Sequence, residues 1–226
     1  MLQQFSSFIQ DTPNCELFKS ALQSQPINLI TNLAFLISGW KIYGLLKKHK
    51  IINKDLWLLF YGVILVGLGS SIRHYHSNIL TLIIDGLPML GLICLTVYLF
   101  GKYLFKLNRI QSQIAILGFA LLMAFTILIL NKNIRPAIVF SLISQFVCLP
   151  IILISYKRKQ EITGVLITAV GFLFLAAVAF IIDLYFCPKL LFGTHFLWHI
   201  FNSLALYYLA KYLILLSNHL YHTLEV

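Results

Sequence analysis

Residues 163–185 read TGVLITAVGFLFLAAVAFIIDLY, a stretch whose only charged residue is Asp183, close to its end. A run of about 20 apolar residues is long enough to cross the hydrocarbon core of a bilayer as a helix. Backbone polar groups in lipid must be paired within the spanning structure, which excludes irregular loops and open sheet edges. This stretch therefore predicts a membrane-spanning helix.

Six similar apolar stretches predict an all-α membrane protein, a seven-transmembrane helix bundle that forms a single domain over residues 1–226. The chain is 60% hydrophobic and 11% charged, with a mean hydropathy of +0.89, whereas about a quarter of the residues in soluble proteins are charged. The N-terminus lacks a basic segment followed by an apolar one, so we expect no cleavable signal peptide. The predicted spans are about 27–46, 56–72, 79–100, 113–130, 135–156, 163–185 and 194–217.

The basic residues indicate the orientation of these spans. The net charge is +10, and Lys and Arg gather in short clusters between the apolar runs, leaving no surface on which we expect nucleic acid to bind. Lys and Arg are enriched in cytoplasmic connections, so we expect the N-terminus outside and the C-terminus in the cytoplasm. Eleven of the 17 basic residues lie at the expected cytoplasmic side, namely Lys41, Lys47, Lys48, Lys50, Lys54, Lys102, Lys106, Arg109, Lys157, Arg158 and Lys159.

Three histidines at the expected outer ends of the spans predict a metal site. His195 and His199 are four residues apart in HFLWH (195–199), so both imidazoles project from one face of a helix. His74 lies at a matching depth at the end of the second span and can supply a third nitrogen. Three protein ligands leave the fourth tetrahedral position for water, which is the pattern of catalytic zinc.

Two further polar residues lie near these histidines. Ser70 precedes His74 by one helical turn on the same face, where its hydroxyl can hydrogen-bond substrate or metal-bound water. Asp85 begins the third span after a short connection and can point back at the metal. A carboxylate beside zinc-bound water can act as a general base, and an ionisable residue at membrane depth indicates function.

Other interpretations of these residues remain open. Two histidines at this spacing are common in helices without any metal, and His76, His219 and His222 can be interfacial polar residues. Asp183 can cap a helix end or hydrogen-bond a metal ligand. A haem or copper electron carrier would require pairs of histidines that face each other across the bundle.

Several motifs together resemble the alkaline ceramidases, which belong to a superfamily of seven-helix metal hydrolases that includes the adiponectin receptors. The resemblance runs from about Cys15 to the end of the last span. The spacings of its polar residues are specific, with His74 eleven residues before Asp85. The matching motifs are NLITN (28–32), GLGSSIRH (67–74), DGLPM (85–89), DLYFC (183–187) and HFLWH (195–199).

The resemblance implies a zinc-dependent hydrolase that cleaves the amide bond of ceramide or a related N-acyl lipid. His74, His195 and His199 would hold Zn²⁺, Asp85 would take a proton from the zinc-bound water, and Ser70 would stabilise the oxyanion. The products would be a fatty acid and a sphingoid-type amine. The substrate is expected to enter from the outer leaflet of the membrane, so the active site of this multi-pass protein would face the non-cytoplasmic side.

The resemblance also bears on disulfide and calcium sites. The family pairs an N-terminal cysteine with one after the sixth span, which implies a disulfide between Cys15 and Cys187. Of the family's carboxylate-rich calcium site only Glu16 clearly matches, and Gln25 stands where a glutamate is usual, so we do not expect calcium. Gly86 occupies a position that is acidic in ceramidases.

Arg73 and the likeness to adiponectin receptors each raise a further possibility about the function. Arg73 replaces an apolar residue beside His74, which predicts a contact with an anionic headgroup. A receptor of the adiponectin-receptor type, with a structural zinc, shares the serine-to-histidine and double-histidine spacings. The shorter gap from His74 to Asp85, the LPM triplet at 87–89 and the opposite expected orientation favour a ceramidase.

Overall fold

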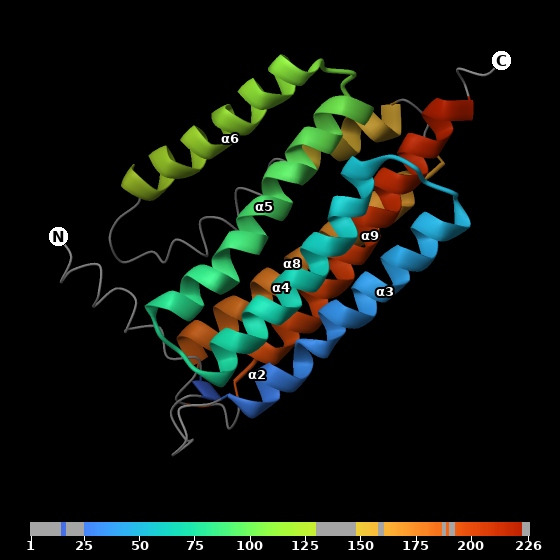
Figure 1. The fold of residues 1–226 in the computed structure, drawn as a ribbon. Helices are drawn as coiled ribbons and strands as arrows, with labels where there is room; N and C mark the ends of the chain where they lie inside the picture. The colour runs from blue at the N-terminus through green and yellow to red at the C-terminus, as the bar shows by residue number, and fades with distance from the viewer. Residues whose placement is uncertain are drawn as a thin grey trace.

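The computed structural model describes residues 15–16, 25–129, 148–157, 161–186, 189 and 193–222, and these form helices without any strand. The long helices run side by side as a bundle (Figure 1). Residues 148–157 form a further, shorter helix. The bounds of the others are Pro26–Thr31 (α2), Leu33–Lys48 (α3), Lys54–Tyr75 (α4), Ile79–Tyr103 (α5), Arg109–Ile129 (α6), Thr163–Phe186 (α8) and His195–His222 (α9).

Local capping explains where two of these helices begin. The side-chain oxygen of Asn53 accepts a hydrogen bond from the backbone N–H of Asp55 at the start of α4, at 2.9 Å. At the start of α5, Asn78 and Thr81 form a reciprocal capping box. Both arrangements satisfy backbone N–H groups that have no partner within the helix.

Within the described residues, five helices, counting α2 and α3 as one, are long and apolar enough to cross a membrane, and they coincide with five of the seven predicted spans. The predicted span 113–130 falls largely within α6, of which Arg109–Leu122 is apolar. Most of the predicted span 135–156 lies outside the described residues, and its last part is helical. A bundle of seven spans and the orientation of its termini therefore stay predictions.

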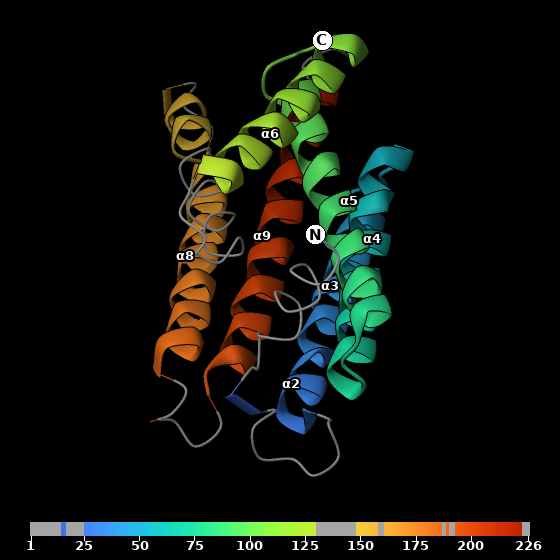
Figure 2. The same cartoon turned by 90° about the vertical axis from the view of Figure 1, so that its left-hand side faces the viewer.

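The helices pack in a definite order around α9. This helix contacts α8 and α3, whereas α4 lies between α3 and α5, and α6 contacts α5. Figure 2 shows α6 inclined to the other helices. Large apolar side chains cover the outward faces as well as the interior, for example Leu65 and Leu68 on α4 and Leu87 on α5, each about half exposed. Such outward faces suit contact with lipid.

Elements from distant parts of the sequence meet at one end of the bundle. The backbone N–H of Gln25, just before α2, donates to the carbonyl of His74 near the end of α4, at 2.9 Å. The start of α9 lies at the same end, because His199 contacts His74. The polar residues singled out in the sequence are therefore gathered where α2, α4 and α9 meet.

Candidate metal centre

Three imidazoles form a buried cluster at this end of the bundle. His74 is near the end of α4, and His195 and His199 occupy the first two turns of α9. All three are buried, with His199 completely so. Nε2 of His74 lies 3.1 Å from Nε2 of His199, and one ring nitrogen from each residue lies within 4.8 Å of the others. Nitrogens this close together could hold one metal ion.

Two of these rings are oriented by hydrogen bonds to Gln25, just before α2, and to Asn28 in α2. Nδ1 of His74 lies 2.6 Å from the side-chain oxygen of Gln25, and Nδ1 of His199 lies 3.0 Å from the carbonyl oxygen of Asn28. Both oxygens can only accept, so each Nδ1 carries the proton and each Nε2 presents a lone pair to the cluster. Partners of this kind fix the tautomer of metal-binding histidines.

The role of Gln25 could not be found from sequence spacing. Gln25 lies 49 residues before His74, and no periodicity connects the two positions. The same side-chain oxygen also accepts a hydrogen bond from the amide of Asn28, at 2.9 Å. Gln25 is therefore part of a small network that holds the imidazole of His74 in place.

Asp183 fixes the start of the helix that carries the histidine pair. Its buried carboxylate accepts hydrogen bonds from the backbone N–H groups of Thr194, at 2.7 Å, and His195, at 3.0 Å. The hydroxyl of Thr194 donates to the carbonyl of Ala179 on α8, at 2.6 Å. Asp183 thus caps α9 from the neighbouring helix, which agrees with the first of the two interpretations of this residue.

The third imidazole is held by packing. The ring of His195 stacks on Trp198, with the ring centroids 5.3 Å apart and the planes 18° from parallel. Nδ1 of His195 is buried and has no hydrogen-bond partner within the described residues. Trp198 was not singled out from the sequence, because an aromatic residue one turn along an apolar helix is ordinary there.

Ser70 and Asp85 likewise carry buried atoms without partners in the described part of the chain. Ser70 lies one turn before His74 on α4, and its hydroxyl oxygen is buried and unpaired. One carboxylate oxygen of Asp85 is also buried and unpaired. Such atoms are rare in proteins and are typical of a site that binds a ligand, water or ion.

The other carboxylate oxygen of Asp85 lies 3.8 Å from Nε of Arg73. Both side chains are mostly buried, with 15% of Arg73 and 17% of Asp85 exposed. The sequence predicted that Arg73 would contact an anionic headgroup. In the structure its ion pair is internal and connects the end of α4 to the start of α5.

A glycine brings the backbone of α5 close to this part of α4. A Cβ atom at Gly69 would lie 2.6 Å from the carbonyl oxygen of Ile84 and 3.2 Å from Cα of Asp85. Only glycine fits without displacing the backbone. Gly69 therefore allows α5 to approach α4 beside Ser70, and this approach sets the position of Asp85.

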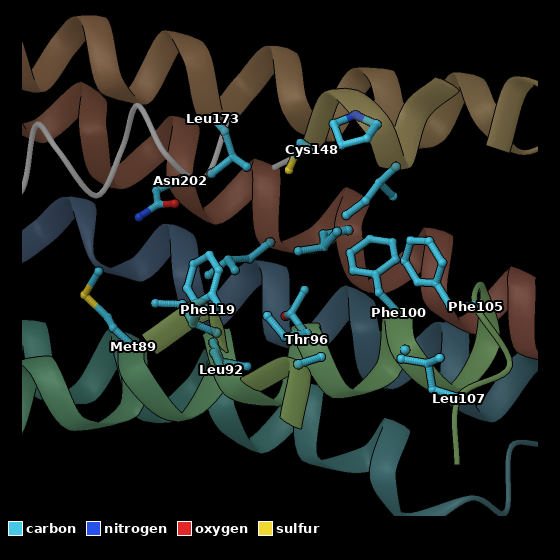
Figure 3. A pocket seen from close by; sticks show the side chains of 18 of the residues that line it. Met89, Leu92, Thr96, Phe100, Phe105, Leu107, Phe119, Cys148, Leu173 and Asn202 are labelled. Carbon is cyan, nitrogen blue, oxygen red and sulfur yellow. The ribbon is translucent and has the colours of Figure 1, made fainter. Parts of the chain in front are cut away.

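An apolar cavity of about 400 Å³ extends from this region along the bundle (Figure 3). Val66, one turn before Ser70 on α4, and Met89, one turn after Asp85 on α5, are the lining residues of these two helices that lie closest in sequence to the histidine end of the bundle. From Met89 to Gly101 the cavity follows α5 for about 18 Å, at 1.5 Å per residue. Its walls are almost entirely apolar, so it suits a long hydrocarbon chain.

The residues before α2 have structural contacts. The carboxylate of Glu16 accepts hydrogen bonds from the backbone N–H groups of Ile27 and Asn28, the latter at 2.9 Å, and so caps the start of α2. Cys15 is buried with its sulfur 3.3 Å from the carbonyl oxygen of Asp183. The only acidic residue that clearly matched a calcium site thus stabilises a helix end.

The cysteines bear on the expected disulfide. Cys94 and Cys148 are free thiols, whereas Cys15 is disulfide-bonded. Cys187 lies outside the described residues. The pairing of Cys15 with Cys187 therefore stays a prediction.

Comparison with families of known proteins gives a match to the family model described as Ceramidase, over residues 19–224. The matched region covers nearly the whole chain and includes all three clustered histidines, Ser70 and Asp85. Comparison with individual curated proteins gives no match.

Proposed function

Because this chain belongs to the ceramidase family, we propose that it cleaves the amide bond of ceramide or a related N-acyl lipid with the help of zinc. The family match confirms the resemblance seen in the sequence motifs, and it implies a hydrolase acting on ceramide-like substrates. Together with the five long apolar helices, it identifies an integral membrane protein. The products would be a fatty acid and a sphingoid-type amine.

The observation that carries the proposal is the cluster of His74, His195 and His199. Their ring nitrogens lie within 4.8 Å of one another, and two of them present lone pairs only 3.1 Å apart. Facing lone pairs repel each other unless a cation or proton lies between them. Three imidazole nitrogens, two of them on rings whose tautomers are fixed by hydrogen bonds, suit zinc. When bound, zinc supplies Lewis acidity that polarises a carbonyl group and acidifies water.

Asp85 and Ser70 are the groups we propose for the proton transfers and for carbonyl binding. Asp85 would accept a proton from the water that attacks the carbonyl carbon, and then donate it to the amine nitrogen as the C–N bond breaks. Ser70 would donate a hydrogen bond to the carbonyl oxygen as it becomes negative. Both residues carry the buried, unpaired oxygen that such a role requires. The ion pair with Arg73 would orient the carboxylate of Asp85.

The apolar cavity supports a lipid as the substrate. It begins one turn below Ser70 and Asp85, so a hydrocarbon chain inside it would place its polar end at the histidines. The distribution of Lys and Arg supports a site that faces the non-cytoplasmic side of the membrane. A substrate of this kind would then enter from the outer leaflet.

The family match favours this hydrolase over the receptor alternative, since the matching model is that of the ceramidases. In a receptor with a structural zinc, Ser70 and Asp85 would have no reaction to serve. The cavity would then also lack a substrate.

Metal analysis combined with an activity assay tests the proposal. Protein purified in detergent should contain about one zinc per chain and should release fatty acid from an N-acylated lipid. His195→Ala should lose both, whereas His76→Ala is the matched control, because His76 is exposed and lies outside the cluster. If His195→Ala kept its zinc and its hydrolysis, the proposed metal site would be wrong.

A further inference from the structure

Asn202 is, with Thr96, one of two residues with a polar oxygen or nitrogen in a side chain that lines the otherwise apolar wall of the cavity. It lies on α9, three residues after His199, and Figure 3 shows its amide at the same end of the cavity as Met89. The residue is half-buried, and none of the hydrogen bonds found among the described residues involves its side chain. An amide surrounded by apolar groups within a membrane is costly unless it is paired. A ligand bound in the cavity could supply the hydrogen-bond partner of this amide.

The position of Asn202 along α9 fixes which part of a ligand it can reach. Three residues of helix place it about 4.5 Å deeper than His199. Val66 and Met89, the lining residues one turn from Ser70 and Asp85, offer no strong hydrogen-bonding group. An extended chain advances roughly 1.2 Å per bond, so about four bonds separate the histidines from the level of Asn202.

We propose that Asn202 determines specificity by hydrogen-bonding a hydroxyl group that the lipid substrate carries within about four bonds of its amide. This inference rests on the proposed function. The side-chain amide has both donor and acceptor atoms, so it can pair with a hydroxyl in either direction. The described lining residues include no charged side chain, which favours a neutral hydroxyl over an ionised group.

Matched substrate pairs test this role. The members of the first pair differ only in a hydroxyl on the α or β carbon of the acyl chain. The members of the second differ only in a hydroxyl beside the amine-bearing carbon. For one pair, the wild-type protein should favour the hydroxylated member by about 10- to 100-fold in kcat/KM. Asn202→Leu should bring that ratio close to one, and the responding pair identifies the chain that Asn202 contacts.

Two further variants separate this role from general damage to the cavity. Thr96→Val removes a hydroxyl from the same cavity about 10 Å deeper than Met89, at 1.5 Å per residue, and should leave the ratio unchanged. Asn202→Thr keeps a hydrogen-bonding group and should keep part of the preference for the hydroxylated substrate. This variant tests the role even if Asn202→Leu fails to fold. If the wild-type protein favours neither hydroxylated member, or if Asn202→Leu keeps the wild-type ratio, the inference is overturned.

A binding measurement separates this inference from the proposed function. If the zinc-loaded protein hydrolyses no lipid amide, the proposed function fails, and calorimetric binding of the same two matched pairs of N-acyl lipids then decides the role of Asn202. Tighter binding of the hydroxylated member of one pair by about 10-fold or more, lost in Asn202→Leu, would support it. Equal Kd values within both pairs would overturn it.

Discussion

Replacing Gly69 by alanine tests whether the close approach of α4 and α5 sets the geometry of the active site. The added methyl group would lie 2.6 Å from the carbonyl oxygen of Ile84, whereas ordinary contacts begin at 3.4 Å. The obstructing atom belongs to the helix backbone, which cannot rotate away as a side chain could. Restoring normal contact requires α5 to move away from α4 by about 0.8 Å, the difference between these two distances.

The expected effect on catalysis is larger than the effect on stability. Overpacking costs about 1–3 kcal/mol, and replacing glycine by alanine within a helix returns about 1 kcal/mol, so the net destabilisation is about 0–2 kcal/mol. Asp85 would be displaced with α5 relative to Ser70 and the histidines. A misplacement of about 1 Å can reduce the rate by about 100-fold.

Gly86→Ala is the matched control for this variant. Gly86 is next to Asp85 on α5, and a methyl group there would have nothing within 4 Å. We expect Gly69→Ala to lower kcat on an N-acyl lipid by about 100-fold with the zinc content unchanged, and Gly86→Ala to stay close to wild type. Full activity in Gly69→Ala, or equal losses in both variants, would refute the proposed importance of this contact.

Three further variants probe the proposed metal site and the residues that support it. Gln25→Leu removes the acceptor for Nδ1 of His74 and should weaken zinc binding by about 10- to 100-fold, measured by competition with a chelator; an unchanged affinity would contradict the orienting role. Asp85→Asn should keep its zinc but lose hydrolysis by about 100-fold or more, and full activity would exclude Asp85 as the base. Asp183→Ala removes both hydrogen bonds to the start of α9 and should destabilise the protein by about 2 kcal/mol or more. Thermal unfolding in detergent measures this loss, which should be absent if α9 does not depend on the cap.

Hydropathy predicted most of the helical framework, because the bilayer imposes both helical structure and span length. The spans predicted at 56–72 and 163–185 match α4 and α8 to within a few residues. The break at Asn32 between α2 and α3 was not predicted, since NLITN contains neither proline nor glycine. The first and last residues of the helices were predicted less closely, because they depend on capping hydrogen bonds that hydropathy does not reveal.

The site was predictable only where its geometry follows from helix periodicity. The four-residue spacing of His195 and His199 fixes a shared face, and the shared depth of the span ends brought His74 into consideration. Contacts set by tertiary packing left no such pattern. The stacking of Trp198 on His195 and the close approach of α5 to Gly69 depend on how side chains and helices pack. The spacing of residues in a single sequence does not encode this packing.

The hydrogen bond between Asn28 and His199 joins positions 171 residues apart. During synthesis, the first helix therefore enters the membrane long before the ring that it orients has been made. No partially translated chain can bring all three imidazoles together to hold the proposed metal until α9 has been inserted and has docked against α2 and α4. If the protein is the metal-dependent hydrolase proposed above, it becomes active only after its last helix has been inserted, and any truncation before His199 would remove the proposed metal centre.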